Sequence, residues 1–444
     1  MNNLLNKTYR FLLLLFLALP LQAFSQNDSI DLATIIDSVV NHNPLILQSQ
    51  EKVNSGVLRE QLARSAYNPN IYTSASASRM FPVSAFDFTL PDPQSGEMVT
   101  KHFQFVPDIA MDYSLKLSQL IYDFGRTGNN AGLQQTMTEI SRLGTDQLKQ
   151  RLVLASAGYY YNLMYIQQAL KIKTDQLNAL NQHLDIIRKK QVTGSSTKYE
   201  ILATQVRIST TQAQVADLES SRRILISHLN NLMNSRYNTL NVKNDVLAGK
   251  PEAISDSTFS LALENRPEMK LARETETAAE WGNRIAKSGS NPTLSFFGST
   301  GYKNGYMGEI NALKFNYSAG LSLMIPIFDN GRKKINTKLA GSAFTDSQLA
   351  AQNTGNQIRD EINESYASMQ LAYTKIDQYA AQVAFAEEAY NHAKANYAAG
   401  AITNLDLLDA SNALAESRLS MLRAQVDFKF YQLKFKSALG EMLY

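Results

Sequence analysis

The sequence predicts a mainly α-helical fold with a membrane β-barrel, in which long helical hairpins are joined to four short strands. Three observations predict this fold class. The chain repeats itself, each half contains a very long run without proline, and each half contains segments in which apolar and polar residues alternate. The repeat fixes which segments of the two halves correspond.

The first 25 residues predict a cleaved secretory signal. Lys7 and Arg10 precede the apolar run Phe11–Leu19, and small residues follow at Ala23 and Ser25. This order is typical of a signal peptide. A short membrane anchor is the weaker interpretation, because a spanning helix needs roughly 20 apolar residues. We therefore expect export, with a mature chain that begins near Gln26.

Composition excludes several classes of protein. The 43 Lys and Arg residues are nearly balanced by 40 Asp and Glu residues, so the chain lacks the basic footprint of a nucleic-acid binder. It contains no cysteine, which excludes disulfides, thiolate metal sites and a lipidated N-terminal Cys. No stretch after residue 25 is apolar enough for a transmembrane helix. We expect an exported chain that is periplasmic, secreted or inserted as a β-barrel.

A shared motif aligns the two halves. Leu115–Arg126 matches Leu321–Arg332, and each segment ends in an Asp, a Gly and an Arg at matching positions. Gly194 and Gly400 are separated by the same distance in sequence as the two arginines. We therefore expect a single unit over 26–444, built from two structural repeats at about 31–231 and 257–440.

The first half carries an insertion. The pairs Pro44 with Pro267 and Pro69 with Pro292 are offset by more residues than the two arginines are, so the extra residues lie between Pro69 and Arg126. They fall around 81–107, which contains four prolines and several phenylalanines. This composition predicts a long exposed loop between two strands.

The runs without proline predict long helices. Arg126–Gly194 and Arg332–Gly400 would each form a helix roughly 100 Å long. Apolar residues recur every seven positions, which indicates the seam of a coiled coil and is not explained by an ordinary amphipathic helix. The residues at these positions are Leu163, Leu170, Leu177 and Leu184 in the first half, and Ile362, Met369, Ile376, Val383, Tyr390 and Tyr397 in the second.

Each long helix is predicted to turn back at a glycine. Gly194 and Gly400 are each followed by Thr-x-x-acid, the capping-box pattern of a new helix. The returning arms, about 197–231 and 403–438, are shorter than the outgoing ones. Additional helices must therefore complete the base of the structure, and the sequence places them near 31–40, 44–65, 257–264 and 267–287.

Four segments are predicted as strands, at about 69–80, 109–121, 292–302 and 315–327. In the second and fourth, apolar residues alternate with polar ones, as in a strand with one apolar face. Their length suits a strand that crosses a membrane. Four strands cannot close a barrel, and lipid does not tolerate an open edge, so several copies must share one barrel. A water-soluble sandwich would leave two very long hairpins on a very small core.

Together these features resemble the TolC family of outer-membrane efflux proteins. The resemblance rests on the two halves, the strands followed by Asp-x-Gly-Arg, the glycine tips and the closing segment Lys436–Gly440, and it covers essentially the whole mature chain. It implies a homotrimer whose 12-stranded barrel lies in outer-membrane lipid and continues as a periplasmic α-barrel. It also implies a periplasmic adaptor protein and an inner-membrane transporter of the RND or ABC type.

The resemblance also implies a gate at the periplasmic tips. In the family, rings of aspartate follow the second glycine, and the matching residues here are Asp406 and Asp409. Asp406 is equally well explained as a helix cap, whereas capping explains Asp409 poorly. Tyr397, Tyr199 and Glu200 match positions of the tip network. The family's arginine after the second glycine is Ile402 here, so any closing salt bridge must differ.

The remaining motifs favour structure over chemistry. Asp123, Gly125 and Arg126, with their second-half copies, are expected to form strand-to-helix junctions. The five histidines lie far apart in sequence, and no phosphate loop or nucleophile motif is present. The sequence therefore predicts no enzyme, no metal and no cofactor. A passive export channel is the leading hypothesis, and a periplasmic adaptor or another structural coiled-coil protein of an envelope transport complex is the alternative.

Overall fold

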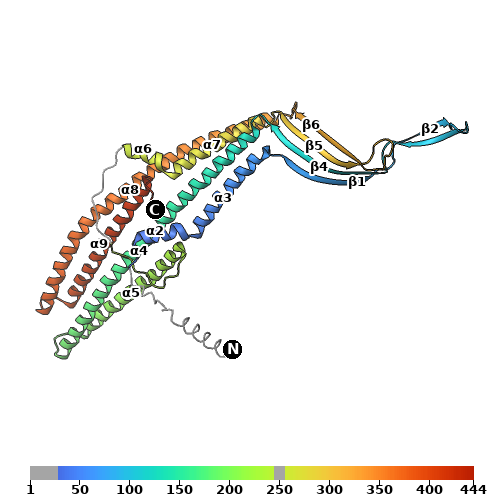
Figure 1. The fold of residues 1–444 in the computed structure, drawn as a ribbon. Coiled ribbons are helices and arrows are strands. Elements are labelled where there is room, and N and C mark those ends of the chain that lie inside the picture. The colour runs from blue at the N-terminus through green and yellow to red at the C-terminus, as the bar shows by residue number, and fades with distance from the viewer. Residues whose placement is uncertain (1–28, 245–255) are drawn as a thin grey trace, which may run out of the picture.

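The computed structural model describes residues 29–244 and 256–444, and it shows an elongated molecule (Figure 1). A β-sheet forms one end and two helical hairpins form the other, so the predicted mainly α-helical fold with few strands is confirmed. The expected signal peptide lies outside the described residues. None of the described helices is long and apolar enough to span a membrane.

The first half begins with two helices and ends in a long helical hairpin. Its elements are α2 (Leu32–His42), α3 (Pro44–Arg64), a short 3-10 turn (Ser65–Tyr67), β1 (Asn70–Arg79), β2 (Ala85–Pro91), β3 (Met98–Gln104), β4 (Ile109–Tyr122), α4 (Arg126–Val192) and α5 (Lys198–Met233). The second half repeats this order without the extra strands. Its elements are α6 (Asp256–Asn265), α7 (Pro267–Ser288), β5 (Thr293–Lys303), β6 (Lys314–Met324), α8 (Arg332–Ala398) and α9 (Asn404–Ala438).

Four strands form one antiparallel sheet in the order β1-β4-β5-β6. β1 and β6 are the two edges, and neither has a further partner within the described chain. One face carries exposed apolar side chains, which include Tyr113 and Leu115 on β4 and Leu321 and Leu323 on β6. The sheet thus has both free edges and an uncovered apolar face.

The prediction of a long exposed loop at 81–107 is wrong in part. β2 and β3 form a separate two-stranded hairpin that extends beyond the main sheet (Figure 1). The prolines that suggested a loop lie at its margins: Pro82 precedes β2, Pro91 is its last residue, and Pro93 and Pro107 lie outside both strands. Proline is tolerated at strand ends, so the hairpin keeps its interior hydrogen bonds.

The fourth strand is shorter than expected. The sequence placed it at about 315–327, but β6 ends at Met324. Pro326 explains the difference, because proline has no N–H to donate to a strand ladder. The alternation of apolar side chains continues past the strand end without backbone pairing, so the pattern alone overstated the strand.

The helices α4 and α8 contain 67 residues each and carry the heptad seams. Leu163 and Leu184 in α4, and Ile362 and Met369 in α8, are buried. α5 returns along α4, and α9 returns along α8. The shorter α3 packs against α4, and α7 packs between α4 and α8, which extends both hairpins towards the sheet. The largest core cluster lies where α2, α4, α5 and α9 meet.

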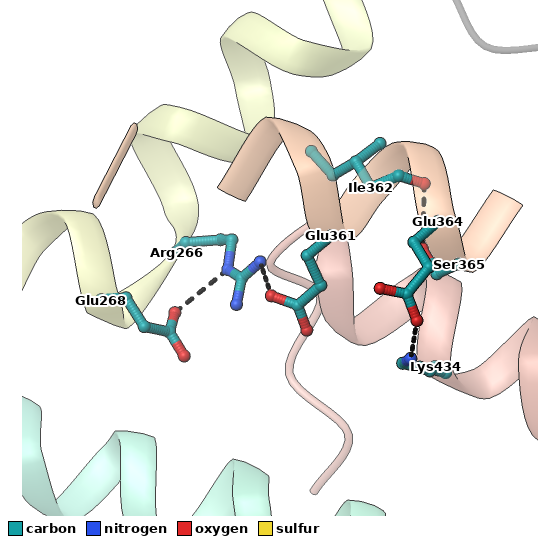
Figure 2. A network of polar contacts seen from close by, with 7 residues as sticks. All are labelled: Arg266, Glu268, Glu361, Ile362, Glu364, Ser365 and Lys434. Atoms are coloured by element: carbon teal, nitrogen blue, oxygen red, sulfur yellow. Dashed lines mark hydrogen bonds and ion pairs between the residues drawn. The ribbon is translucent and has the colours of Figure 1, made fainter. Parts of the chain in front are cut away.

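A polar network ties the start of α7 to the middle of α8 (Figure 2). The guanidinium of Arg266 is buried, with Nε 3.1 Å from Oε2 of Glu268 and Nη1 2.6 Å from Oε2 of Glu361. Nearby, Nζ of Lys434 on α9 lies 3.2 Å from Oε1 of Glu364 in a more exposed pair. Arg266 therefore holds the start of α7 against the middle of α8 through the ion pairs of its buried guanidinium.

Candidate gate at the hairpin tips

Both hairpins turn in the same way. Gly194 and Gly400 each have φ of 76°, a left-handed conformation that glycine adopts without the strain of a side chain. The Ser195 amide donates to the Lys190 carbonyl, and the Ala401 amide donates to the equivalent carbonyl of Asn396, at 2.9 Å in each case. These bonds close the ends of α4 and α8, so the returning helices can begin a few residues later.

Asp406 completes a capping box at the start of α9. Its Oδ2 accepts hydrogen bonds from the Thr403 amide at 2.9 Å and from the Thr403 hydroxyl at 2.6 Å. The Asp406 amide in turn donates to the Thr403 hydroxyl at 3.2 Å. These side-chain and backbone hydrogen bonds lower the pKa of Asp406. The carboxylate is therefore charged and oriented, which suits a cap and leaves it solvent-exposed at the tip.

Asp409, one turn further along α9, pairs with the other hairpin. Nη2 of Arg207 on α5 lies 3.1 Å from Oδ1 of Asp409. This carboxylate is still 62% exposed, whereas the Arg207 side chain is 29% exposed. Sequence reasoning missed Arg207, because the two residues lie in different halves of the chain. The pair is a salt bridge between the two hairpins.

Tyr397 and Glu200 meet between the two tips. The Tyr397 hydroxyl donates to Oε2 of Glu200 at 3.3 Å, and the Ser196 hydroxyl donates to the same oxygen at 2.8 Å. Burial, and then the negative charge of Glu200, raise the pKa of Tyr397 to about 12. Nζ of Lys190 lies 4.5 Å from the centre of the Tyr397 ring. The hydrogen bond between Tyr397 and Glu200 joins the end of α8 to the start of α5.

Tyr199 does not join this cluster. Its side chain is 71% exposed on α5. Among the described residues, no hydrogen bond links Tyr199 to Glu200, Tyr397 or Asp409. Within the described residues, Tyr397 and Glu200 are thus the only two of the five suggested gate residues that contact each other, whereas Asp406 bonds to Thr403 and Asp409 pairs with Arg207.

Asn404 is a central residue of the tip that the sequence did not indicate. It is buried at the first position of α9, and its amide nitrogen lies 3.3 Å from the Glu200 carbonyl and 3.2 Å from the Thr204 hydroxyl. Its Oδ1 lies 2.6 Å from Nε2 of His183 on α4. Because Oδ1 can only accept, His183 donates a proton through Nε2. Asn404 thus links α9 to both helices of the first hairpin.

The surroundings of His183 favour its neutral form. Burial lowers its pKa most, the hydrogen bond with Asn404 opposes that shift, and the positive charge of Lys190 lowers the pKa further. The imidazole also contacts the Tyr397 ring edge-on, at 5.0 Å between centres. A cavity of about 290 Å³ lies beside these side chains, and Lys190, Lys394 and Tyr390 line it. His183 is therefore a titratable group inside the contact between the hairpins.

The strand-to-helix junctions each place an Asp side chain at the start of a long helix. Gly125 and Gly331 take left-handed conformations immediately before α4 and α8. Oδ2 of Asp123 accepts from the Thr127 amide at 2.7 Å, and Oδ2 of Asp329 accepts from the Lys333 amide at 2.8 Å. Each carboxylate satisfies an amide in the first turn that has no partner within the helix. Among the described residues, no three His, Asp or Glu side chains are grouped to hold a metal ion.

The family model for outer membrane efflux proteins matches residues 35–235 and 258–441. Outer membrane protein TolC of Escherichia coli strain K12 is 23% identical over 347 residues, which cover 75% of this chain and 70% of that protein. The alkaline protease secretion protein AprF of Pseudomonas aeruginosa is 23% identical over 325 residues, which cover 71% and 66%.

Solved structures have the same fold. The Campylobacter jejuni CmeC outer membrane channel superposes with a TM-score of 0.77 at 17% identity, over 92% of this chain and 85% of that one. The open state of the Neisseria gonorrhoeae MtrE outer membrane channel also gives 0.77, at 18% identity, over 93% and 89%. At this level of identity the superpositions establish the fold alone.

Proposed function

Because the chain belongs to the outer membrane efflux protein family, we propose that three copies assemble into a passive export channel through the outer membrane and periplasm. The channel would form part of a tripartite efflux or type I secretion system. An inner-membrane transporter of the RND or ABC type would supply the solute, and a periplasmic adaptor protein would connect the two. We assign no catalytic step to the chain itself.

The observation that carries this proposal is the incomplete sheet. β1 and β6 are both free edges, and each copy contributes only four strands. A membrane barrel must have no open edge, so β1 of one copy must pair with β6 of another. Three copies give twelve strands, within the range of known outer-membrane barrels. The apolar face of the sheet would then contact lipid, and the exposed aromatic side chains would lie on the outside.

Long helical surfaces also remain uncovered in one copy. Leu339, Leu349 and Phe385 on α8 and Leu62 on α3 are each more than half exposed. Side chains of this size along a coiled-coil helix are commonly buried against another helix. Assembly of three copies would enclose these positions in an α-barrel. A periplasmic adaptor is the poorer hypothesis, because it would leave the apolar face of the four-stranded sheet without lipid.

We further propose that the hairpin tips form the periplasmic gate. The contacts of Asp409 with Arg207, of Tyr397 with Glu200 and of Asn404 with His183 would hold the two hairpins of each copy together in the closed state. Threefold symmetry would place three copies of Asp406 and Asp409 around the pore. Separation of the hairpins would break these polar contacts together and widen the entrance.

Mass measurement and conductance together test the channel. The purified protein in detergent is expected to have the mass of a trimer, and planar bilayers that contain it should show stepwise ion conductance. A stable monomer, or a trimer that conducts no ions even after the tips are loosened by substitution, would overturn the proposal. Fractionation with the outer membrane provides a check in cells.

A further inference from the structure

The β2–β3 hairpin has one apolar face. In its register, Phe86 lies opposite Phe103, Phe88 opposite Lys101, and Leu90 opposite Val99. Side chains of opposite residues lie on the same side of an antiparallel pair, so these six share a face. The rings of Phe86 and Phe88 are 5.9 Å apart between centres. We call the six residues the apolar hairpin face.

The other face is mainly polar, although Met98 at its end is 68% exposed, and its central polar side chains bond to one another. The hydroxyls of Thr89 and Thr100 are 3.0 Å apart, and Nδ1 of His102 lies 2.6 Å from Oδ1 of Asp87. By contrast, the five apolar side chains of the apolar hairpin face are between 40% and 53% exposed. An isolated two-stranded hairpin is marginally stable in water, and clustered exposed apolar side chains commonly mark a contact surface. We therefore expect another apolar surface to cover this face.

We propose that in the assembled channel the apolar hairpin face packs against the same face of the two other copies, so that three hairpins form an apolar cap over the outer end of the barrel. This inference rests on the proposed trimer. The hairpin is continuous with the trimer interface, because it emerges directly from β1, the edge strand that must pair with the next copy. The three hairpins are thus tethered around one opening.

The dimensions allow the hairpins to meet. Twelve strands about 4.8 Å apart and tilted by about 40° enclose a barrel with a radius of about 12 Å. Strands of seven residues, such as β2 and β3, extend about 24 Å at about 3.4 Å per residue. A hairpin that starts at the rim can therefore reach the barrel axis with its turn, where Leu90 and Val99 form the last pair of the apolar hairpin face.

The charges favour other copies over a membrane surface. The hairpin carries the carboxylates of Asp87, Asp92 and Glu97, and all three lie off the apolar face, on the polar face or at the turn. An anionic lipid surface would repel such a hairpin, whereas packing of the apolar faces keeps the carboxylates in water. Lys101 lies on the apolar face, but its long side chain can extend to the edge.

Cysteine cross-linking tests the cap, and the natural absence of cysteine leaves no background. Val99→Cys places a thiol on the apolar hairpin face near the turn, and Thr100→Cys places one on the opposite face at the next residue. The trimer is purified in detergent, its mass is measured, and it is treated with a short bis-maleimide before denaturing electrophoresis. We expect covalent dimers as the main species for Val99→Cys and only traces for Thr100→Cys. Both thiols should react with a monofunctional maleimide.

The outcomes separate the cap from the channel. A Val99→Cys trimer whose thiol is reactive but forms no dimers would overturn the cap and leave the channel intact, and Leu90→Cys provides a second position on the same face. Cross-linking in cells to a different envelope protein, without dimers, would also overturn it. The absence of any trimer would overturn both proposals.

Discussion

Arg207 and Asp409 form a 3.1 Å ion pair that connects the returning arm of the first hairpin to the returning arm of the second. Asp409 is one of the two carboxylates expected to face the closed pore. Its charge is thus partly balanced within the same copy, which distinguishes it from Asp406, whose hydrogen bonds are made to Thr403 of its own helix start.

This difference predicts that removal of Arg207 increases block by multivalent cations. Arg207→Gln should expose three uncompensated Asp409 carboxylates near the pore, which attract cations more strongly. Single-channel recording with a trivalent cation added from the periplasmic side measures the effect. Arg188→Gln is the control, since it removes the same charge near the same tip from a pair within α4. Equal block in both variants would argue against Asp409 at the pore.

Replacement of both carboxylates should act in the opposite direction. The variant with Asp406→Ala and Asp409→Ala is expected to conduct more in single-channel recordings and to be blocked less by multivalent cations, because the acidic rings are removed. A role in capping alone would weaken the start of α9 and leave the block unchanged. Parental conductance and block in the double variant would show that both carboxylates are structural.

Asn404→Ala should loosen the contact between the hairpins. The substitution leaves the part-buried His183 N–H without its acceptor, which costs about 1–3 kcal/mol, whereas the Thr204 hydroxyl still donates to the Glu200 carbonyl at 2.8 Å. Hydrogen exchange at the start of α9 should accelerate, and the fraction of time spent open should rise in bilayers. Lys198→Ala, at the matching but exposed position of the first half, is expected to change neither measurement.

The tip should also loosen as the pH falls below about 6.5. The pKa of His183 in the folded protein lies below its ordinary value of 6.5, so the unfolded segment binds protons first on acidification. The contribution of neutral His183 is complete above pH 6.5 and declines as the pH falls towards the lowered pKa. Nearby Lys190 disfavours the charged form, and Glu200 favours it.

Hydrogen exchange at the tip, corrected for intrinsic rates, measures this pH dependence between pH 7.5 and 5. His183→Gln keeps a side-chain N–H donor but cannot take up a proton, so its profile should be flatter than that of the parent. His392→Gln serves as the control, because His392 is exposed on α8. A parental profile in His183→Gln would contradict the assignment.

At the base of the second half, Arg266→Ala should be strongly destabilising. It removes a buried charge that is paired with Glu268 and Glu361, and the loss of one partner of a buried pair typically costs about 3–5 kcal/mol. Lys434→Ala breaks the more exposed pair with Glu364 shown beside it in Figure 2 and should cost about 1 kcal/mol or less. Denaturant unfolding followed by helical circular dichroism would compare them. Similar losses would contradict the distinction.

The sequence predicted the helices well because their signals are local and repeated. The absence of proline over 67 residues, the heptad seam and the glycine at each turn all act within one helix or at its end. Even the capping box at Thr403 was visible, since its two partners lie three residues apart. The strand hairpin at 85–104 was missed because its flanking prolines resemble those of a loop.

The tip contacts could not be predicted from the same patterns. Arg207 with Asp409, and His183 with Asn404, join residues that are more than 200 positions apart in sequence. No local pattern marks Asn404 as buried. The residue at the matching position of the first half, Lys198, is exposed, so the repeat does not indicate burial either. Such pairs depend on how two hairpins pack side by side, which the periodicity of either hairpin leaves undetermined.

The equal length of α4 and α8 constrains how this chain can change. Both helices begin at the same kind of junction, next to the same sheet, and both contain 67 residues, so their far ends lie at one depth. One additional heptad in both arms of a single hairpin would displace that tip by about 10 Å and separate Arg207 from Asp409. Insertions are therefore tolerated only when both halves lengthen together, which ties the evolution of one repeat to that of the other.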